Sequence, residues 1–267
     1  MPEGHTLHRL AKLHRRRYAG RPVEVSSPQG RFDASAVDGR VLKRAEAHGK
    51  HLFHVYGPDA TVHVHLGLYG TFTEFEHPVV EPVGQVRMRM VGATHWTDLR
   101  GPTRCEVLTD VEVAALHARL GPDPLRRDAE PELAYRGIAK SRQPIAVLLM
   151  DQRVVAGVGN VYRAEVLFRH GIHPMTPGNR IDRALWDVLW ADLVLLMRDG
   201  VKVGRIDTVR PEHLPQVTGR APRRDRHGGE VYVYRRAGLP CLLCATPVAV
   251  AELAGRNLFW CPTCQPA

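Results

Sequence analysis

Four cysteines near the end of the chain have the spacing of a metal site. Cys241 and Cys244 form one Cys-x-x-Cys pair, and Cys261 and Cys264 form another after sixteen intervening residues. Each pair can hold two corners of a tetrahedral ion from a tight turn, and four thiolates complete the coordination of zinc. Such a site has no open position for substrate, so the pattern predicts one structural zinc ion per chain. Two disulfides are the alternative.

The amino terminus could supply a nucleophile. Pro2 follows Met1, and removal of that methionine would expose a secondary amine. The reference pKa of an α-amino group is about 8, which leaves far more free base at neutral pH than a lysine has. Such an amine forms an iminium with a carbonyl carbon, and Glu3 beside it could transfer protons. The alternative is a processed terminus without chemistry.

Fifteen histidines suggest a different site. His63 and His65 share one face of a predicted strand, and His51 and His54 are near them in sequence. No HExxH motif or comparable carboxylate partner accompanies them, and half-buried strand histidines usually satisfy hydrogen bonds. A histidine-based metallohydrolase stays open as an alternative, while Cys105 is predicted to be a small core residue.

The composition is that of a basic globular protein. The 267 residues carry a formal charge of +9, and 44% of them are hydrophobic and 24% charged. This length favours two domains, and the charge favours binding to polyanions such as nucleic acid. Neither a signal-like apolar segment nor a run of eighteen apolar residues occurs, so we expect a soluble, intracellular protein without a membrane partner.

The first half of the chain predicts a β-sandwich with one helix. Leu7, Ala11 and Tyr18 lie at helical spacing, and Gly20 ends the pattern. Short alternating segments divided by Gly and Pro follow, as is typical of strands. We therefore expect an N-terminal β-sandwich domain over residues 2–122 with the helix packed on it.

The second half reads as helical after a break. Prolines, glycines and mixed charge interrupt the periodicity over residues 123–143, which predicts a linker. A helical domain is expected over 144–230, with Asn160 as an N-cap and Gly171 as a helix stop. The zinc finger is expected over 231–267.

Two further features of the second half bear on its surface. The apolar stripe that begins near residue 181 is predicted to end at Gly200. Residues 201–230 are rich in Lys and Arg and lack periodicity. They predict a surface loop, either solvated throughout or ordered on DNA.

Several segments, in one order, resemble the formamidopyrimidine-DNA glycosylase and endonuclease VIII family. They are PEG at the start, HGKHLFH around Lys50, HLGLYG at 65–70, LLMDQRVVAGVGNVYRAEVLFRHGIHP at 148–174 and GRNLFWCPTCQ at 255–265. The resemblance covers both halves and the terminal cysteines. It implies an α+β multidomain fold: a catalytic β-sandwich with a flanking helix, a helical helix-two-turn-helix DNA-binding domain, and a four-Cys zinc finger at the end.

The resemblance also implies a function. Members of the family remove an oxidised base and cleave the resulting abasic strand by β/δ-elimination. The implied partner is double-stranded DNA with an oxidised base or an abasic site, bound by a monomer in the cytoplasm and, through DNA, at the nucleoid. A non-catalytic damaged-DNA-binding protein of the same fold is the alternative.

Site residues are implied position by position. Pro2 matches the family's nucleophile, Glu3 its proton donor and acceptor, and Lys50 a hairpin lysine used near the sugar and phosphate. The residues implied in DNA binding are the wedge residues Leu68 and Tyr69, the phosphate-holding Asn160, and the zinc-hairpin Arg256.

Two sequence features bear on which kind of damaged base is removed. The PEG start and the adjacent Leu68 and Tyr69 resemble endonuclease VIII-like members, which implies a preference for oxidised pyrimidines. A purine-preferring enzyme that acts on 8-oxoguanine is the alternative. The chain departs from the family's usual PELPE or PEGPE start at His5 and Thr6, which leaves the floor of the lesion pocket undefined.

Overall fold

The computed structural model describes residues 2–225 and 229–267, which form two compact units. Unit 1 ends at Arg119 and unit 2 begins at Leu120. Each unit has its own apolar core. Among the described residues, no helix is both long enough and apolar enough to cross a membrane.

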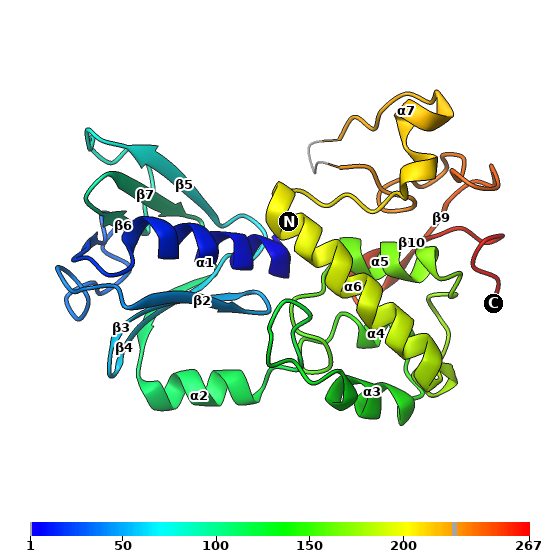
Figure 1. Cartoon of the computed structure of the whole chain (residues 1–267), viewed down its shortest axis with the longest axis horizontal. Helices are drawn as coiled ribbons and strands as arrows, with labels where there is room; N and C mark the ends of the chain where they lie inside the picture. Colours follow the sequence, from blue (N-terminus) through cyan, green and yellow to red (C-terminus); the bar gives the residue numbers. More distant parts are fainter. Residues whose placement is uncertain (1, 226–228) are drawn as a thin grey trace. The chain divides into compact units, whose positions relative to one another are not determined.

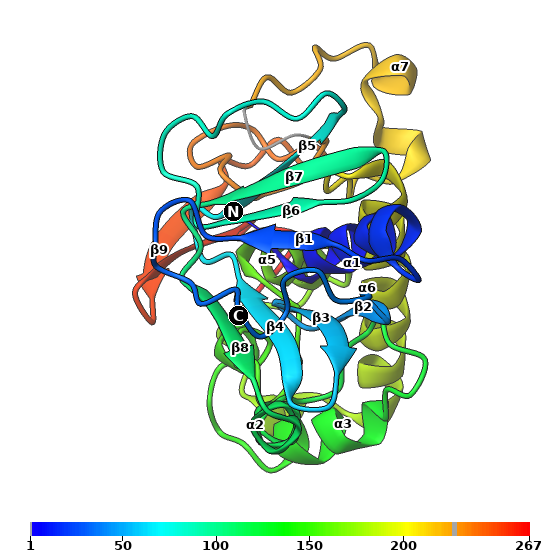
Figure 2. The ribbon, with the colours of Figure 1, turned by 90° about the vertical axis from the view of Figure 1, so that its left-hand side faces the viewer.

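Unit 1 contains two antiparallel four-stranded sheets, seen as separate layers in Figure 2. One sheet has the order β1 (Glu24–Ser26), β6 (Met88–Val91), β7 (His95–Arg100) and β5 (Thr71–Glu76). The other has the order β2 (Arg44–His48), β3 (His51–Gly57), β4 (Ala60–His65) and β8 (Arg104–Leu108). Val62 and Val64 from the second sheet share a core with Met88 and Met90 from the first. The predicted β-sandwich is therefore confirmed.

Two helices complete unit 1. Helix α1 (Gly4–Tyr18) packs on β2 and buries Leu7, Ala11 and Tyr18, so the predicted stripe is confirmed. Helix α2 (Asp110–Ala118) begins with a capping box in which Thr109 and Glu112 satisfy each other's backbone amides. Cys105 is buried in the core of this unit, as predicted.

Unit 2 is mainly helical and ends in a hairpin (Figure 1). Its elements are α3 (Pro131–Ala139), α4 (Ile145–Leu148), α5 (Asn160–Arg169), η1 (Gly178–Arg180), α6 (Arg183–Val203), η2 (Pro211–His213), α7 (Pro215–Thr218), β9 (Ala249–Leu253) and β10 (Arg256–Trp260). Helix α5 is the centre of the unit: every residue in it except Arg169 is buried. The helical domain and the terminal four-cysteine hairpin agree with the predicted fold class.

The residues predicted to form a linker, 123–143, carry helix α3. Pro131 occupies the first turn of this helix, where a missing backbone N–H costs nothing. Ala134 and Ile138 are buried in the core of unit 2. Proline therefore starts a helix here, although in the sequence it reads as a break.

Two helix ends differ from the predicted ones. Helix α5 has Gly159 as its N-cap, and Asn160 is its first helical residue. Helix α6 continues past Gly200 to Val203, and Gly204 ends it with a left-handed φ of +84°. The predicted N-cap and the predicted stop at Gly200 are therefore wrong by one and by a few residues.

The basic stretch over 201–230 is anchored at both ends, and its residues 226–228 lie outside the described ones. The buried carboxylate of Glu165 accepts hydrogen bonds from the backbone amides of Tyr232, Val233 and Tyr234 and from the Thr208 hydroxyl. The predicted surface loop is therefore wrong for the start of the stretch, where α6 runs to Val203 and Ile206 and Val209 are buried in the core of unit 2.

Candidate functional site

The start of the chain is packed into unit 1. Glu3 is the N-cap of α1 and is fully buried, and its backbone oxygen accepts a hydrogen bond from the Thr6 amide at 2.9 Å. Pro2, directly before it, is half-buried. His5 is also buried, and burial lowers its pKa to about 4, so this imidazole is neutral at pH 7. A buried carboxylate thus adjoins the residue whose amine becomes free on removal of Met1.

Lys50 lies in the tight turn between β2 and β3. His48 pairs with His51 across this hairpin, which leaves Gly49 and Lys50 as the two turn residues. Gly49 has a φ of +58°, which suits the twist of a two-residue hairpin. Burial lowers the pKa of His65, and the nearby charge of Lys50 contributes to this shift. The Lys50 ammonium group therefore lies near the end of β4.

Two large apolar side chains project from the loop that follows β4. Leu68 is 56% exposed and Tyr69 is 85% exposed. Glycines shape this loop, because a Cβ on Gly67 would lie 1.8 Å from Thr103 Oγ1, and one on Gly70 would lie 2.3 Å from a backbone oxygen. Apolar side chains held out from a tightly packed loop are suited to insertion into another molecule.

Strand register places the lysine turn and this loop side by side. His51 of β3 pairs with His48 of β2 on one side and with His65 of β4 on the other. The turn that carries Lys50 and the loop that begins after His65 therefore leave the sheet at the same end.

Helix α1 brings Pro2 and Glu3 to that end as well. The Gly20 amide, just past the last turn of α1, donates to the Leu42 carbonyl at 2.8 Å, and β2 begins two residues after Leu42. Since α1 packs along β2 and runs in the opposite direction, its first turn lies beside the β2–β3 turn (Figure 1). The candidate nucleophile, the carboxylate, the lysine and the exposed apolar pair thus share one end of unit 1.

The histidines beside Lys50 form a hydrogen-bonded chain. His51 Nδ1 lies 2.8 Å from His63 Nε2, and His63 Nδ1 lies 3.0 Å from Glu106 Oε1. Burial lowers the pKa of His51 to about 3 and also lowers that of His63. An ionised carboxylate only accepts, so each neutral imidazole carries its proton on Nδ1. These strand histidines are hydrogen-bonded, as expected from the sequence.

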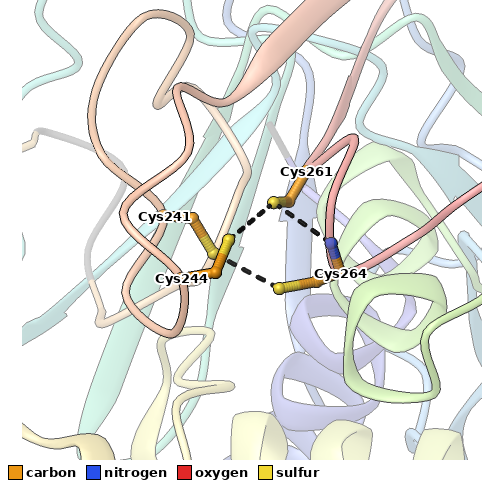
Figure 3. Close-up of side chains that lie close together, drawn as sticks. All are labelled: Cys241, Cys244, Cys261 and Cys264. Atoms are coloured by element: carbon orange, nitrogen blue, oxygen red, sulfur yellow. Dashed lines mark hydrogen bonds between the residues drawn. The ribbon is translucent and has the colours of Figure 1, made fainter.

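The four cysteines converge in unit 2 (Figure 3). Their sulfur atoms all lie within 4.8 Å of one another, with 3.8 Å between Cys241 and Cys264 and 3.4 Å between Cys244 and Cys261. A tetrahedral ion with Zn–S bonds of about 2.3 Å separates its ligands by about 3.8 Å. None of the four forms a disulfide. In the described part of the chain, this is the one group of three or more side chains placed to hold a metal ion.

A hairpin spans the interval between the two cysteine pairs. Ala254 and Gly255 form its two-residue turn with φ angles of +52° and +69°, and Arg256 follows as the first residue of β10. Leu258 and Phe259 of the same strand are buried in the core of unit 2. The hairpin thus shares the core of the helices and presents Arg256, which is exposed, at its tip.

Asn160 connects helix α5 to this hairpin. Its Nδ2 donates to the backbone oxygen of Asn257 at 3.0 Å, and its Oδ1 accepts from the buried guanidinium of Arg163. Arg163 also donates to the Asn257 oxygen at 3.3 Å and to the Ala146 oxygen at 3.3 Å. Because a guanidinium can only donate, these bonds fix the orientation of the Asn160 amide. Asn160 and Arg256 are therefore held close together.

Sequence reasoning missed two of these arrangements. Arg163 stands three residues after Asn160, so both lie on one helix face, and this spacing is the signal that could have joined them. The pairing of His63 with Glu106 has no comparable local signal, because it depends on the register of two strands.

Three stretches of the chain match known families. Residues 1–105 match the formamidopyrimidine-DNA glycosylase N-terminal domain, and residues 120–211 match the formamidopyrimidine-DNA glycosylase H2TH domain. Residues 238–267 match the zinc finger found in FPG and IleRS. Together with the converging sulfur atoms, this last match identifies the cysteine quartet as the ligands of one zinc ion.

Similarity to individual proteins extends over the full length. Endonuclease 8 1 of Mycobacterium tuberculosis is 61% identical over 271 residues, which cover 99% of this chain and 100% of that protein. Formamidopyrimidine-DNA glycosylase of Parasynechococcus marenigrum is 34% identical over 227 residues, 81% of this chain and 79% of that protein. The structure of Lactococcus lactis Fpg in complex with an abasic site containing DNA shares the fold, with a TM-score of 0.78 and 21% identity over 99% of this chain and 100% of that one.

Replacement of one zinc ligand should empty the site. In Cys261→Ser we expect the zinc content to fall from one ion per chain to near zero, because a serine hydroxyl is a poor ligand in a closed thiolate site. Cys261 is also fully buried, so unit 2 should lose stability while unit 1 stays folded. Elemental analysis measures the zinc, and limited proteolysis reports on each unit. Cys105→Ser, a change at a buried cysteine of unit 1, is the control; undiminished zinc in Cys261→Ser would contradict the assignment.

Proposed function

Because this chain belongs to the formamidopyrimidine-DNA glycosylase and endonuclease VIII family, we propose that it is a bifunctional base-excision-repair enzyme. It removes an oxidised base from double-stranded DNA and cleaves the strand at the abasic site, acting as a monomer in the cytoplasm and at the nucleoid. The observation that carries this proposal is the shared location of Pro2, Glu3 and Lys50 at one end of unit 1 in a chain with full-length relatives.

The proposed reaction begins at the amine of Pro2, after removal of Met1. The amine attacks C1′ of the damaged nucleotide, the bond from C1′ to the base breaks, and the base leaves with a proton that Glu3 transfers. The bond from C1′ to O4′ then breaks as O4′ takes up a proton, which opens the sugar ring and gives an iminium between Pro2 and C1′ that acidifies the C2′ proton. Loss of that proton expels the 3′ phosphate, a second elimination expels the 5′ phosphate, and water hydrolyses the remaining iminium. Lys50 stabilises negative charge near the sugar and phosphate.

Unit 2 supplies the proposed grip on the DNA backbone. Asn160 is the first residue of α5, where the helix dipole favours an anion. Its bond to the backbone oxygen of Asn257 places it next to Arg256. Two contacts to phosphates would hold a bent strand while the damaged nucleotide leaves the stack. The zinc ion stabilises the hairpin on which Arg256 stands and takes no part in the chemistry.

Arg256→Ala should weaken binding to duplex DNA of any sequence, because a phosphate contact carries no sequence information. The slope of log K against log salt should fall in magnitude by about one, which corresponds to one lost phosphate contact. Fluorescence anisotropy at several salt concentrations measures both quantities. Arg142→Ala, a change at another exposed arginine of unit 2, should leave the slope unchanged. An unaltered slope in Arg256→Ala would remove this residue from the phosphate contacts.

Leu68 and Tyr69 are the proposed wedge that fills the space left by the extruded nucleotide. Leu68→Ala should slow excision of a damaged base by about tenfold or more, because the cost of unstacking is no longer offset. Cleavage at a ready-made abasic site should change much less, since no base has to be extruded. Single-turnover assays on the two substrates give this ratio. Val111→Ala removes an exposed apolar side chain elsewhere in unit 1 and should affect neither step.

The proposed substrates are oxidised pyrimidines, such as thymine glycol and hydroxylated uracils, in preference to 8-oxoguanine. The exposed Leu68–Tyr69 pair and the similarity to Endonuclease 8 1 support this preference. The test is single-turnover excision on duplexes that differ only in the lesion. Faster release of 8-oxoguanine than of thymine glycol would favour the purine alternative and leave the glycosylase and lyase activities in place.

A non-catalytic DNA-binding protein is the second candidate. It would be favoured if intact-mass measurement found Met1 retained, because the nitrogen of Pro2 would then be an amide without a nucleophilic lone pair. Lesion-bearing duplexes would in that case be bound and left intact.

A further inference from the structure

Unit 2 contains a cavity of about 620 Å³ that the proposed function does not use. It is lined by residues between His213 and Asp225 on one side and by residues 235–242, which include the zinc ligand Cys241, on the other. This volume is within the usual range for sites that bind small molecules. Neither Asn160 nor Arg256 lines it.

Arginine is the most frequent residue type in the lining. Five arginines contribute to it: Arg220, Arg223, Arg224, Arg235 and Arg236. The carboxylates paired with them are Asp225, 2.6 Å from Arg223, and Glu230, 2.5 Å from Arg220. Among the described residues, ion pairs with carboxylates thus engage two of the five guanidinium groups.

Arg236 is a half-buried arginine of this cavity, and other arginines lie close to it. Arg236 donates to the backbone oxygens of Tyr232 and Pro240, so its position is fixed. Burial lowers its pKa, and the charges of Arg220 and Arg223 add to this effect, whereas the charges of Glu165 and Cys241 oppose it. An anion in the cavity would relieve this repulsion.

Donors remain available for such an anion. The Nε of Arg220 is buried, and no atom of the described residues accepts a hydrogen bond from it. Arg224 and Arg235 are exposed and are in no ion pair with a described residue. Arg235 has a left-handed backbone with φ of +54°, which is uncommon for a non-glycine residue and recurs at functional sites.

We propose that this cavity binds a phosphate-bearing ligand of up to nucleotide size. The planar guanidinium fork matches phosphate oxygens in pairs, and several forks around one cavity can enclose a phosphate from more than one side. Leu239 and Leu242 provide an apolar wall for the organic part of the ligand. The phosphate belongs either to a DNA strand or to a free nucleotide. The proposal does not depend on glycosylase activity, because it rests on residues outside the catalytic end of unit 1.

The first test uses the full-length zinc-loaded protein and two probes, inorganic pyrophosphate and deoxythymidine 5′-monophosphate. Isothermal titration should show binding of both to the wild type. The double variant Arg224→Ala/Arg235→Ala should bind them at least about tenfold more weakly, since it removes two charge-assisted contacts. Arg142→Ala/Arg180→Ala, which removes two exposed arginines elsewhere in unit 2, should bind them as the wild type does. No binding to the wild type, or equal weakening in both double variants, would overturn the proposal.

A second arm identifies the source of the phosphate. If the ligand is part of a DNA strand, an abasic duplex should displace pyrophosphate, and the salt slope of duplex binding should fall by about two in Arg224→Ala/Arg235→Ala relative to the control. If it is a free nucleotide, duplex and pyrophosphate should bind together with an unchanged slope. Borohydride trapping on the same preparations measures the lyase activity separately. Failure of the cavity proposal can therefore be distinguished from failure of the proposed enzymatic function.

Discussion

Sodium borohydride is expected to trap this protein covalently on an abasic duplex, and a variant with one residue left ahead of Pro2 is expected to give no adduct. The trapped species is the iminium between Pro2 and C1′, which hydride reduces to a stable amine. In the blocked variant the same nitrogen is part of a planar amide, whose lone pair is delocalised. The expected change is therefore from efficient trapping to none, measured as a shifted protein–DNA band on a denaturing gel.

A tag at the carboxyl terminus is the matched control, because it adds mass without changing the amine. It should trap as well as the untagged protein. Equal trapping by the amino-terminally blocked protein would mean that another amine, such as Lys50, forms the adduct, and would reject Pro2 as the nucleophile. Intact-mass measurement of each preparation establishes whether Met1 is absent.

Glu3→Gln is expected to slow base excision by about 10²- to 10⁴-fold, the usual contribution of a positioned proton-transfer group. The amide has nearly the same shape as the carboxyl group, and the backbone bond from Thr6 to residue 3 does not involve the side chain. Cleavage of a ready-made abasic site should fall less, because no base has to leave with a proton. Single-turnover rates on a lesion duplex and on an abasic duplex, compared between variant and wild type, test this.

Glu24→Gln makes the same chemical change at an exposed position of β1 and is the control. It should leave both rates unchanged. Because Glu3 is fully buried, the substitution could also destabilise the fold. Thermal unfolding of Glu3→Gln distinguishes this effect from the loss of proton transfer. An equal loss on both substrates, in a folded variant, would contradict the separate role of Glu3 in base removal.

Much of this architecture follows from local patterns. Alternation along β4 and helical spacing along α1 predict a strand and a helix, because the two periods are typical of these elements. The Cys-x-x-Cys pairs predict the metal site, since two tight turns are enough to present four sulfur atoms. The positions of Pro2, Glu3 and Lys50 at one end of unit 1 could not be derived in this way. They depend on the direction in which α1 packs on β2.

The ends of the helices were the least predictable features. Gly200 reads as a helix end, yet α6 tolerates it at a cost of about 1 kcal/mol and ends where Gly204 adopts a left-handed backbone. Pro131 reads as a linker residue, yet it begins α3. Glycine and proline are compatible with both outcomes, and burial in the core decides between them. The Arg163 link to Asn257 depends on two segments about ninety residues apart in sequence, beyond the reach of any periodicity.

The bond from Asn160 to the backbone oxygen of Asn257 couples the zinc site to the proposed phosphate contacts. Asn257 lies on the hairpin between the two cysteine pairs, so zinc stabilises the same arrangement of Asn160 and Arg256 that would hold phosphates. This coupling is reciprocal: if bound zinc raises the affinity for DNA by some factor, bound DNA raises the affinity for zinc by the same factor. The DNA-bound protein should therefore lose zinc to a chelator more slowly than the free protein does. Metal depletion should first affect the molecules that are not bound to DNA.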